Sequence, residues 1–343
     1  MKTLFQCSTL SQFLKWIFMV FVSSRGLAMS STSMQTTFLA NATRLSLVER
    51  VTSATLTTSF CLMFLSVNAV MLFALRSKSV FRETSRYILL YNLLLADTLQ
   101  LTFSQLMYLL STARVTLSYP LCGVLSTLTS LLSRMSPLLL VVMSLERYVA
   151  VCHPLRHASI ITVRNTMWAV LAVWAFCFFN ILIQGLLLIM FPFEQLQSLQ
   201  MRQPCNSNAM FLVPLSELYA NIYTYFLFTL ASLTIVFSFV GVVLSARSAA
   251  TDKHSAHKAR NTLLLHLVQL GLSLLSVFYS TIMFFIYALL NNVNFSQIQA
   301  ILFVCFFLLP RYLTSLIYGL RDQSLRVVLV YFFLPSPRRV SRS

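Results

Sequence analysis

Charge of either sign is scarce in this sequence, and negative charge is the scarcer. Only 10% of the 343 residues are Asp, Glu, Lys or Arg, and just 8 are acidic, whereas soluble domains contain about 25% charged residues. Glycine and proline number only 6 and 9, which excludes collagen-like and Pro-rich disordered chains. Since 58% of the residues are hydrophobic, the composition excludes an ordinary soluble domain and indicates a membrane protein with several spans.

Long apolar runs, by contrast, are abundant. A helix that crosses a bilayer needs about 20 mostly apolar residues, because its backbone groups can be satisfied only within the helix. Seven windows meet this requirement, and none alternates apolar with polar residues as barrel strands do. They cover residues 51–75, 87–111, 122–148, 166–190, 217–244, 262–289 and 298–318. The sequence therefore predicts an all-α seven-transmembrane helix bundle over residues 51–318, between an N-terminal segment, 1–50, and a tail, 319–343.

Positive charge is distributed unevenly among the connections. Lys and Arg cluster after the first, third, fifth and seventh windows, whereas the opposite connections contain only Arg114 and Arg202. Cytoplasmic loops collect Lys and Arg, so we expect an extracellular N-terminus and a cytoplasmic C-terminus. The formal net charge of +17 then faces anionic lipid of the inner leaflet, and no nucleic-acid partner is needed to explain it.

The N-terminal segment and the sixth connection contain signals of passage through the secretory route. Sequons at Asn41 and Asn294 lie in segments predicted to be outside, where N-glycans are added. Residues 1–28 resemble a poor signal peptide, with an apolar run too short to span a membrane. The alternative is that translation begins downstream, at Met29 or Met34.

Two of the seven cysteines are placed for a disulfide. Cys122 lies at the outer end of the third window and Cys205 in the long outer connection that follows the fourth. An oxidising exterior favours a bond between them. Such a bond would tie the long connection across the mouth of the bundle, giving a lidded cavity open to the outside. The alternative is a pair of free thiols.

Ionisable side chains inside the windows are few. Only Asp97, Arg134 and Arg311 lie well inside one, and each is a functional hypothesis because an unpaired charge in a bilayer is costly. They are too few for a proton relay, and the sequence has no His-Glu-x-x-His or Gly-x-Ser-x-Gly arrangement. We therefore expect neither catalytic activity nor a cofactor.

Four motifs, in order along the chain, resemble those of one family. Residues 143–157 read MSLERYVAVCHPLRH, which resembles the inner signature of rhodopsin-like (class A) G-protein-coupled receptors in its odorant-receptor form. Residues 94–97 (LLAD) are similar to the second-helix motif of that family, and 278–281 (FYST) to the sixth helix of odorant receptors. Residues 317–322 (IYGLRD) resemble the end of the seventh helix.

The seventh window also departs from the family pattern. Where the family has Asn-Pro, this chain has Thr314 and Ser315, so the usual kink and amide are missing. Pro310 would supply a kink about one turn earlier. The difference indicates a divergent, fish-type member of the odorant-receptor group.

The resemblance implies that Glu146, Arg147, Tyr148 and Tyr318 take part in G-protein activation. A carboxylate beside a guanidinium holds it by a charge-assisted hydrogen bond, and in the family this pair restrains the inactive state. The sixth window begins with basic residues and offers no acid, so any such lock is local. The alternative is an ion pair that merely anchors the helix at the interface.

A sodium and water network around Asp97 is also implied, with Asn68, Ser136 and Thr314 as further members. Thr314 would replace the missing Asn. A buried carboxylate needs a cation, water or a proton. The alternative is a protonated Asp97 that bonds to neighbouring hydroxyls.

Ligand recognition is expected in the outer half of the bundle, as in other helix bundles. Thr129, Ser130, Ser133 and Arg134 lie at or near one helical face by their i, i+3 and i+4 spacing. Arg134 could form a fork with a ligand carboxylate, so an anionic ligand is our hypothesis; the alternatives are a pair with Glu217 and snorkelling toward lipid head groups. The candidates opposite, for which core packing is the alternative, are Asn221, Tyr225 and Tyr279.

By resemblance, the chain is an odorant receptor of the plasma membrane and olfactory cilia. It would bind a small extracellular molecule and raise cAMP through a stimulatory heterotrimeric G protein. The rival functions are a rhodopsin-like receptor for a non-odour metabolite or peptide, and a seven-helix transporter, which the shortage of buried carboxylates disfavours. After the seventh window, residues 324–333 predict a short amphipathic helix on the inner leaflet.

Overall fold

The computed structural model describes residues 47–77, 79–189, 200, 201, 205, 214–248, 264, 268, 300–321, 325 and 326. Five long helices dominate this part of the chain. They are α3 (Leu47–Ser77), α5 (Ser85–Thr112), α6 (Tyr119–Cys152), α8 (Val163–Ile189) and α9 (Pro214–Ser248). Two short helices, α4 (Ser79–Arg82) and α7 (Pro154–Ile160), lie between them, and η3 (Phe303–Leu308) continues into α13 (Leu309–Arg321).

The helices coincide with the apolar windows. All five long helices are long and apolar enough to cross a membrane, and a shorter apolar helix runs over Ala300–Leu313. The helices extend a few residues beyond the windows into polar sequence, because backbone hydrogen bonding continues where the chain leaves the hydrocarbon. A multi-span helical protein is thereby confirmed. The sixth window, apart from residues 264 and 268, lies outside the described residues, as do the two sequons and residues 1–28.

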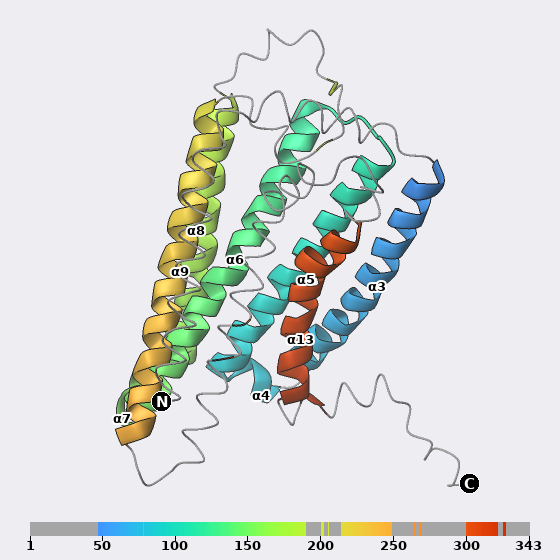
Figure 1. Cartoon of the computed structure of the whole chain (residues 1–343). Helices are drawn as coiled ribbons and strands as arrows, with labels where there is room; N and C mark the ends of the chain where they lie inside the picture. The colour runs from blue at the N-terminus through green and yellow to red at the C-terminus, as the bar shows by residue number, and fades with distance from the viewer. Residues whose placement is uncertain are drawn as a thin grey trace, which may run out of the picture.

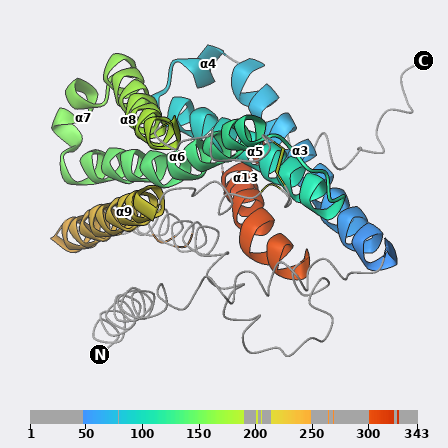
Figure 2. The same cartoon turned by 90° about the horizontal axis from the view of Figure 1, so that it is seen from above.

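Helix α6 occupies the middle of the bundle. Over the stretch suited to span a membrane, 56% of its residues are buried, against 22% for α8. It packs against α5, α8 and α9, and Figure 2 shows it between α8 on one side and α9 on the other. The large buried side chains at its centre are Leu132, Met135, Leu139 and Leu140. The helix that contains Arg134 is therefore in contact with most of the other long helices.

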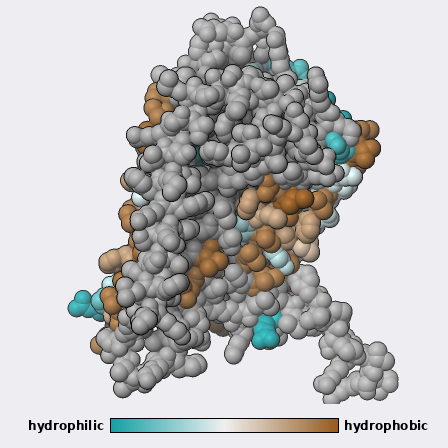
Figure 3. Space-filling model, viewed as in Figure 1, coloured by the Kyte–Doolittle hydropathy of each residue, from teal (hydrophilic) through white to brown (hydrophobic). Residues whose placement is uncertain are grey.

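The outward faces of the helices are apolar. Side chains such as Phe73 on α3, Trp168 and Phe179 on α8 and Phe237 on α9 are more than 60% exposed. In Figure 3, hydrophobic side chains of the described residues lie along the flanks of the bundle. Since these helices are long and apolar enough to cross a membrane, the large apolar side chains on their outside are suited to contact with lipid.

A wide helical turn precedes Pro310. Residues Phe303–Leu308 form a π-helix, after which α13 is regular. Proline has no N–H and its ring clashes with the carbonyl four residues earlier, here that of Phe306, so a departure from regular α-helix geometry is expected beside it, and here it is a π-turn. Aromatic stacking fixes the segment: Phe303 stacks on Tyr108 of α5, with ring centroids 4.7 Å apart. The irregular turn of this helix thus directly precedes Pro310, close to where the sequence predicts a kink.

Candidate functional site

The start of α6 lies at the same end of the bundle as the start of α9 (Figure 1), and a disulfide joins it to Cys205, in the connection between α8 and α9. Cys122 in the first turn of α6 is bonded to Cys205, with Cα atoms 5.7 Å apart, and both residues are almost fully buried. Met201 N donates to the carbonyl of Leu117 at 2.9 Å. The predicted disulfide is confirmed, and the alternative of two free thiols is wrong.

Arg134 is the centre of a polar cluster that joins α6, α8 and α9. Its Nη1 donates to Ser130 Oγ at 2.6 Å and to Asn180 Oδ1 at 3.0 Å. Its Nη2 lies 3.5 Å from Thr224 Oγ1. The guanidinium carbon lies 5.0 Å from the centroid of the Tyr223 ring, within cation–π range. Three helices therefore meet on one guanidinium.

All of these partners are neutral. Gln184, with its amide oxygen turned toward the guanidinium, accepts from both Nη atoms at 3.3 Å and adds another neutral contact. Glu217 is exposed on α9, and in the described part of the chain no carboxylate pairs with Arg134. Arg134 itself is only 7% exposed, so its head group does not snorkel to the interface. Among the described residues, Arg134 is therefore a buried positive charge that is hydrogen-bonded but paired with no carboxylate.

The other ligand candidates of α6 use their hydroxyls within their own helix. Thr129 Oγ1 donates to the carbonyl of Leu125 at 2.6 Å, and Ser133 Oγ donates to the carbonyl of Ser130 at 2.8 Å. Of the three hydroxyl residues predicted on α6, the structure therefore brings only Ser130 to Arg134.

On α9, the residues that contact Arg134 are neighbours of the predicted ones. Asn221 is exposed and Tyr225 is half-buried, whereas Tyr223 and Thr224 reach Arg134. Each residue turns a helix by about 100°, so a shift of one or two positions moves a side chain to another face. Tyr279 lies outside the described residues.

Asn180 is a member of the cluster that the sequence analysis does not include. Its Nδ2 donates to the hydroxyl of Tyr219 at 2.8 Å while its Oδ1 accepts from Arg134. It is 2% exposed in a strongly apolar span. An isolated amide in such a span needs a polar partner, and that requirement is the signal by which it could have been found.

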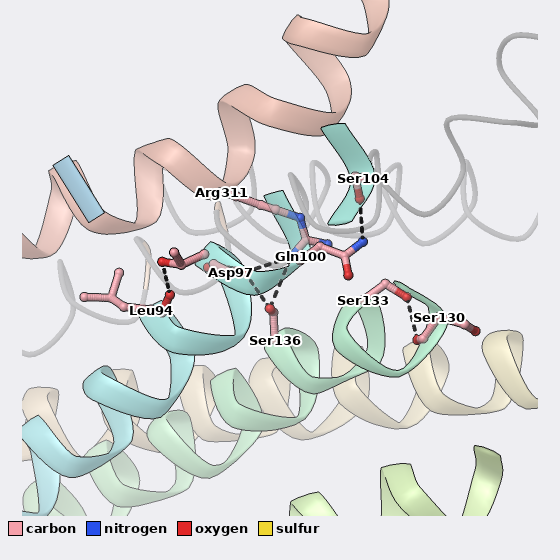
Figure 4. A network of polar contacts seen from close by, with 9 residues as sticks. Leu94, Asp97, Gln100, Ser104, Ser130, Ser133, Ser136 and Arg311 are labelled. Atoms are coloured by element: carbon pink, nitrogen blue, oxygen red, sulfur yellow. Dashed lines mark hydrogen bonds and ion pairs between the residues drawn. The ribbon is translucent and has the colours of Figure 1, made fainter. Parts of the chain in front are cut away.

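Asp97 lies in a second polar cluster, which joins α5, α6 and α13 (Figure 4). Ser136 Oγ donates to Asp97 Oδ1 at 2.6 Å, and Arg311 Nη1 donates to the same oxygen at 2.7 Å. Arg311 Nη1 also lies 3.3 Å from Ser136 Oγ. The side chains of Arg311 and Asp97 are 6% and 2% exposed. The cation within reach of the carboxylate is thus Arg311.

The remaining predicted members of this network are placed differently. Asn68 on α3 is fully buried, but neither atom of its amide has a hydrogen-bonding partner in the described part of the chain. Thr314 lies in α13, and its side chain is outside the described residues. The predicted network does not include Arg311. The signal that could have found it is that Asp97 and Arg311 have opposite charges and both lie well inside predicted spans, where an unpaired charge is costly.

At the far end of α6, Glu146 and Arg147 form a local ion pair. Arg147 Nε lies 2.9 Å from Glu146 Oε2, and His157 Nε2 of α7 lies 4.0 Å from Glu146 Oε1. The Tyr148 ring lies against Phe237 of α9, with ring centroids 5.9 Å apart. Tyr318 belongs to α13, but its side chain is outside the described residues. The pair is local, in the arrangement that the sequence predicts.

Helices of membrane-spanning length, a disulfide from the start of α6 to a loop and a Glu-Arg-Tyr sequence at its other end define a class of helical receptor. Residues 67–318 match the family described as 7 transmembrane receptor (rhodopsin family). The chain therefore belongs to the rhodopsin family of seven-transmembrane receptors. That family consists of receptors and not enzymes, which confirms the expectation of no catalytic activity.

The similar proteins are odorant and olfactory receptors. Odorant receptor 131-2 of Danio rerio is 31% identical over 279 residues, which cover 78% of this chain and 82% of that protein. Olfactory receptor 7A10 of Homo sapiens is 27% identical over 261 residues, 73% of this chain and 81% of that protein. Olfactory receptor 1078 of Rattus norvegicus is 25% identical over 256 residues, 72% and 74% respectively. The resemblance seen in the motifs is confirmed across most of the chain.

Proposed function

We propose that this chain is an odorant receptor that binds a small anionic molecule and activates a heterotrimeric G protein. The ligand enters from outside, beneath the loop held by Cys122 and Cys205. The G protein binds at the end where Glu146, Arg147 and Tyr148 lie. The family and the relatives support the receptor function; a stimulatory G protein, cAMP and a location in the plasma membrane of olfactory cilia rest on resemblance to odorant receptors.

The observation that carries the choice of ligand is that Arg134 is buried and that no carboxylate in the described ranges pairs with it. A buried guanidinium surrounded only by neutral groups retains most of its attraction for an anion. Its planar fork matches the two oxygens of a carboxylate. A small organic acid is therefore the class of ligand that this cluster favours.

Helix α9 offers a route from this cluster to the other end of the bundle. Near one end it provides Thr224 and Tyr223 to Arg134, and near the other it contacts the Tyr148 ring through Phe237 and Gly241. A carboxylate that draws Arg134 away from Thr224 and Asn180 would loosen α6 from α8 and α9. The population of helix arrangements would then shift, as in any two-state receptor.

Two substitutions distinguish between two roles of Arg134: an anchor that binds the ligand, and a structural clamp, by which we mean a side chain that only holds α6 against α8 and α9. Arg134→Gln removes the charge. Asn180→Asp keeps Arg134 and places a carboxylate where the neutral amide oxygen now accepts its hydrogen bond. We expect both variants to lose cAMP responses to small carboxylic acids by about 10- to 100-fold in potency, the value of a charge-assisted hydrogen bond. Ser133→Ala, which removes a hydroxyl bonded within its own helix, is the matched control.

The clamp explanation predicts the reverse for Asn180→Asp. An internal salt bridge would strengthen the contact between α6 and α8, and responses to acids would persist. Full responses in Asn180→Asp and Arg134→Gln, with surface expression equal to that of Ser133→Ala, would exclude Arg134 as the anchor.

The remaining alternative is a rhodopsin-family receptor for a non-odour metabolite or peptide. Transcripts in olfactory sensory neurons and protein in their cilia support the odorant function, whereas expression confined to other tissues supports the alternative. A seven-helix transporter is disfavoured by the match to a receptor family over residues 67–318.

A further inference from the structure

The carboxylate of Asp97 is already paired with a cation that belongs to the chain. Arg311 and Ser136 both donate to its Oδ1, at 2.7 and 2.6 Å. The Arg311 guanidinium also lies 5.5 Å from the centroid of the Phe307 ring, so one side of it is covered by an aromatic face. Both charged side chains are more than nine-tenths buried. The negative charge at this position is therefore neutralised without any free ion.

We infer that Arg311 takes the place of a free sodium ion at Asp97 and holds α13 against α5 and α6. A sodium ion needs oxygen ligands, but Oδ1 of Asp97 and the hydroxyl of Ser136 are both within hydrogen-bonding distance of Arg311. A second cation on this carboxylate would also lie within a few ångströms of the guanidinium, and like charges repel strongly where water is excluded. The residues present thus fit an internal ion pair and not a sodium site.

The backbone next to Arg311 supports this assignment. Arg311 follows Pro310 and the π-helix Phe303–Leu308, and a π-turn rotates the residues beyond it relative to a regular helix. The next residue, Tyr312, stacks on Phe64 of α3 with ring centroids 4.2 Å apart. The wide turn and the stacked ring together fix the face on which Arg311 meets Asp97.

A tethered cation differs from a free one in its consequences. A sodium ion can leave, and its occupancy follows the salt concentration, whereas Arg311 can separate from Asp97 only if α13 moves relative to α5. The stability of this receptor should therefore not depend specifically on sodium. Removal of the guanidinium should leave an unpaired buried carboxylate, which is where a sodium ion would then bind.

Thermal unfolding of the purified full-length receptor tests the inference without ligand or G protein. Midpoints are compared in sodium chloride and in choline chloride at equal ionic strength, for the unaltered chain, Arg311→Gln, Asp97→Asn and the double variant. We expect equal midpoints for the unaltered chain. The unfolding midpoint of Arg311→Gln should be lower by on the order of 5–10 °C, as expected on breaking a buried pair. Part of this loss should be recovered in sodium chloride but not in choline chloride. The double variant should be more stable than Arg311→Gln and indifferent to sodium.

Two outcomes overturn the inference. One is a sodium-specific rise in the midpoint of the unaltered chain, which needs no variant to fold. The other is a double variant whose loss equals the sum of the two single losses, since this means that Arg311 and Asp97 do not interact. Both measurements are independent of odour detection. The inference about Arg311 can therefore be wrong while the proposed function is right, and the proposed function can be wrong while the inference is right.

Discussion

Each of the two buried arginines in the described part of the bundle has a different set of partners. Arg311 donates to a carboxylate and forms a neutral pair with Asp97. Arg134 is bonded to hydroxyl and amide oxygens, and no carboxylate in the part of the chain that the structure describes pairs with it. A buried charge is tolerated when it is paired or hydrogen-bonded, so the first arrangement is suited to joining helices and the second to receiving an anion.

Gly241 is a residue whose small size we expect to matter for signalling. A Cβ built at this position on α9 would overlap the Tyr148 ring next to Arg147. Gly241→Ala must therefore displace either the ring or the helix, and we expect a maximal cAMP response at least about 3-fold lower, equivalent to about 0.6 kcal/mol or more in the activating equilibrium. Dose–response curves normalised to surface expression measure the effect.

Gly185 on α8 provides the matched control. A Cβ at Gly185 meets no atom within 4 Å, so Gly185→Ala should preserve signalling and stabilise α8 by about 0.5–1 kcal/mol through helix propensity. If both glycine variants signal equally, the contact of Gly241 with Tyr148 plays no part in activation.

At the scale of helices, the long apolar windows were the most predictive feature of the sequence. Five windows correspond to helices that could cross a membrane, because length and apolar composition alone set this requirement. The face that a helix turns toward its neighbours was harder to predict from the sequence. Asn221 and Tyr225 were predicted at the ligand, but Thr224 and Tyr223 reach Arg134. Which face of a helix is buried depends on its neighbours, and packing is not encoded in any single window.

Contacts between distant segments were also hard to predict. The structure pairs Asp97 of α5 with Arg311 of α13, although the family pattern indicates an amide in the seventh helix near that carboxylate. Because Thr314 and Ser315 stand where the family has Asn-Pro, the sequence indicates that the partner of Asp97 differs from that of the family, but it does not say which residue takes its place. We attribute the meeting of Arg311 with Asp97 to the π-turn before Pro310, which rotates the residues beyond it.

The connection held by the Cys122–Cys205 disulfide is the element whose release should affect the ligand-binding end most. Cys122→Ser breaks the bond to Cys205, and the loss of a disulfide typically costs about 2–4 kcal/mol. We expect little receptor at the cell surface and no response from the fraction that arrives, as measured by flow cytometry and cAMP assays. Cys305→Ser is the control because Cys305 is free and exposed. Normal signalling by Cys122→Ser would show that the disulfide is dispensable for this site.

For the whole molecule, the distribution of Lys and Arg predicts the orientation in the membrane. The basic connections, including those next to Arg147 and after α13, should face the cytosol, so an epitope tag after residue 343 should be hidden in intact cells. A tag at the N-terminal segment, near Asn41, should be accessible, and Asn41→Gln should remove a glycan. Antibody staining with and without permeabilisation measures both, and a C-terminal tag that stains on intact cells contradicts the orientation and the position of the G-protein site.

The most direct test of ligand-driven signalling is nucleotide exchange itself. Membranes that contain this receptor and a stimulatory G protein are exposed to small carboxylic acids and, in parallel, to the amide or ester of each acid. We predict that at least one acid accelerates exchange of GDP for GTP and that its neutral counterpart does not, because only the acid can pair with Arg134. Equal acceleration by acid and neutral analogue, or exchange that no acid alters, would contradict a receptor gated by an anionic ligand.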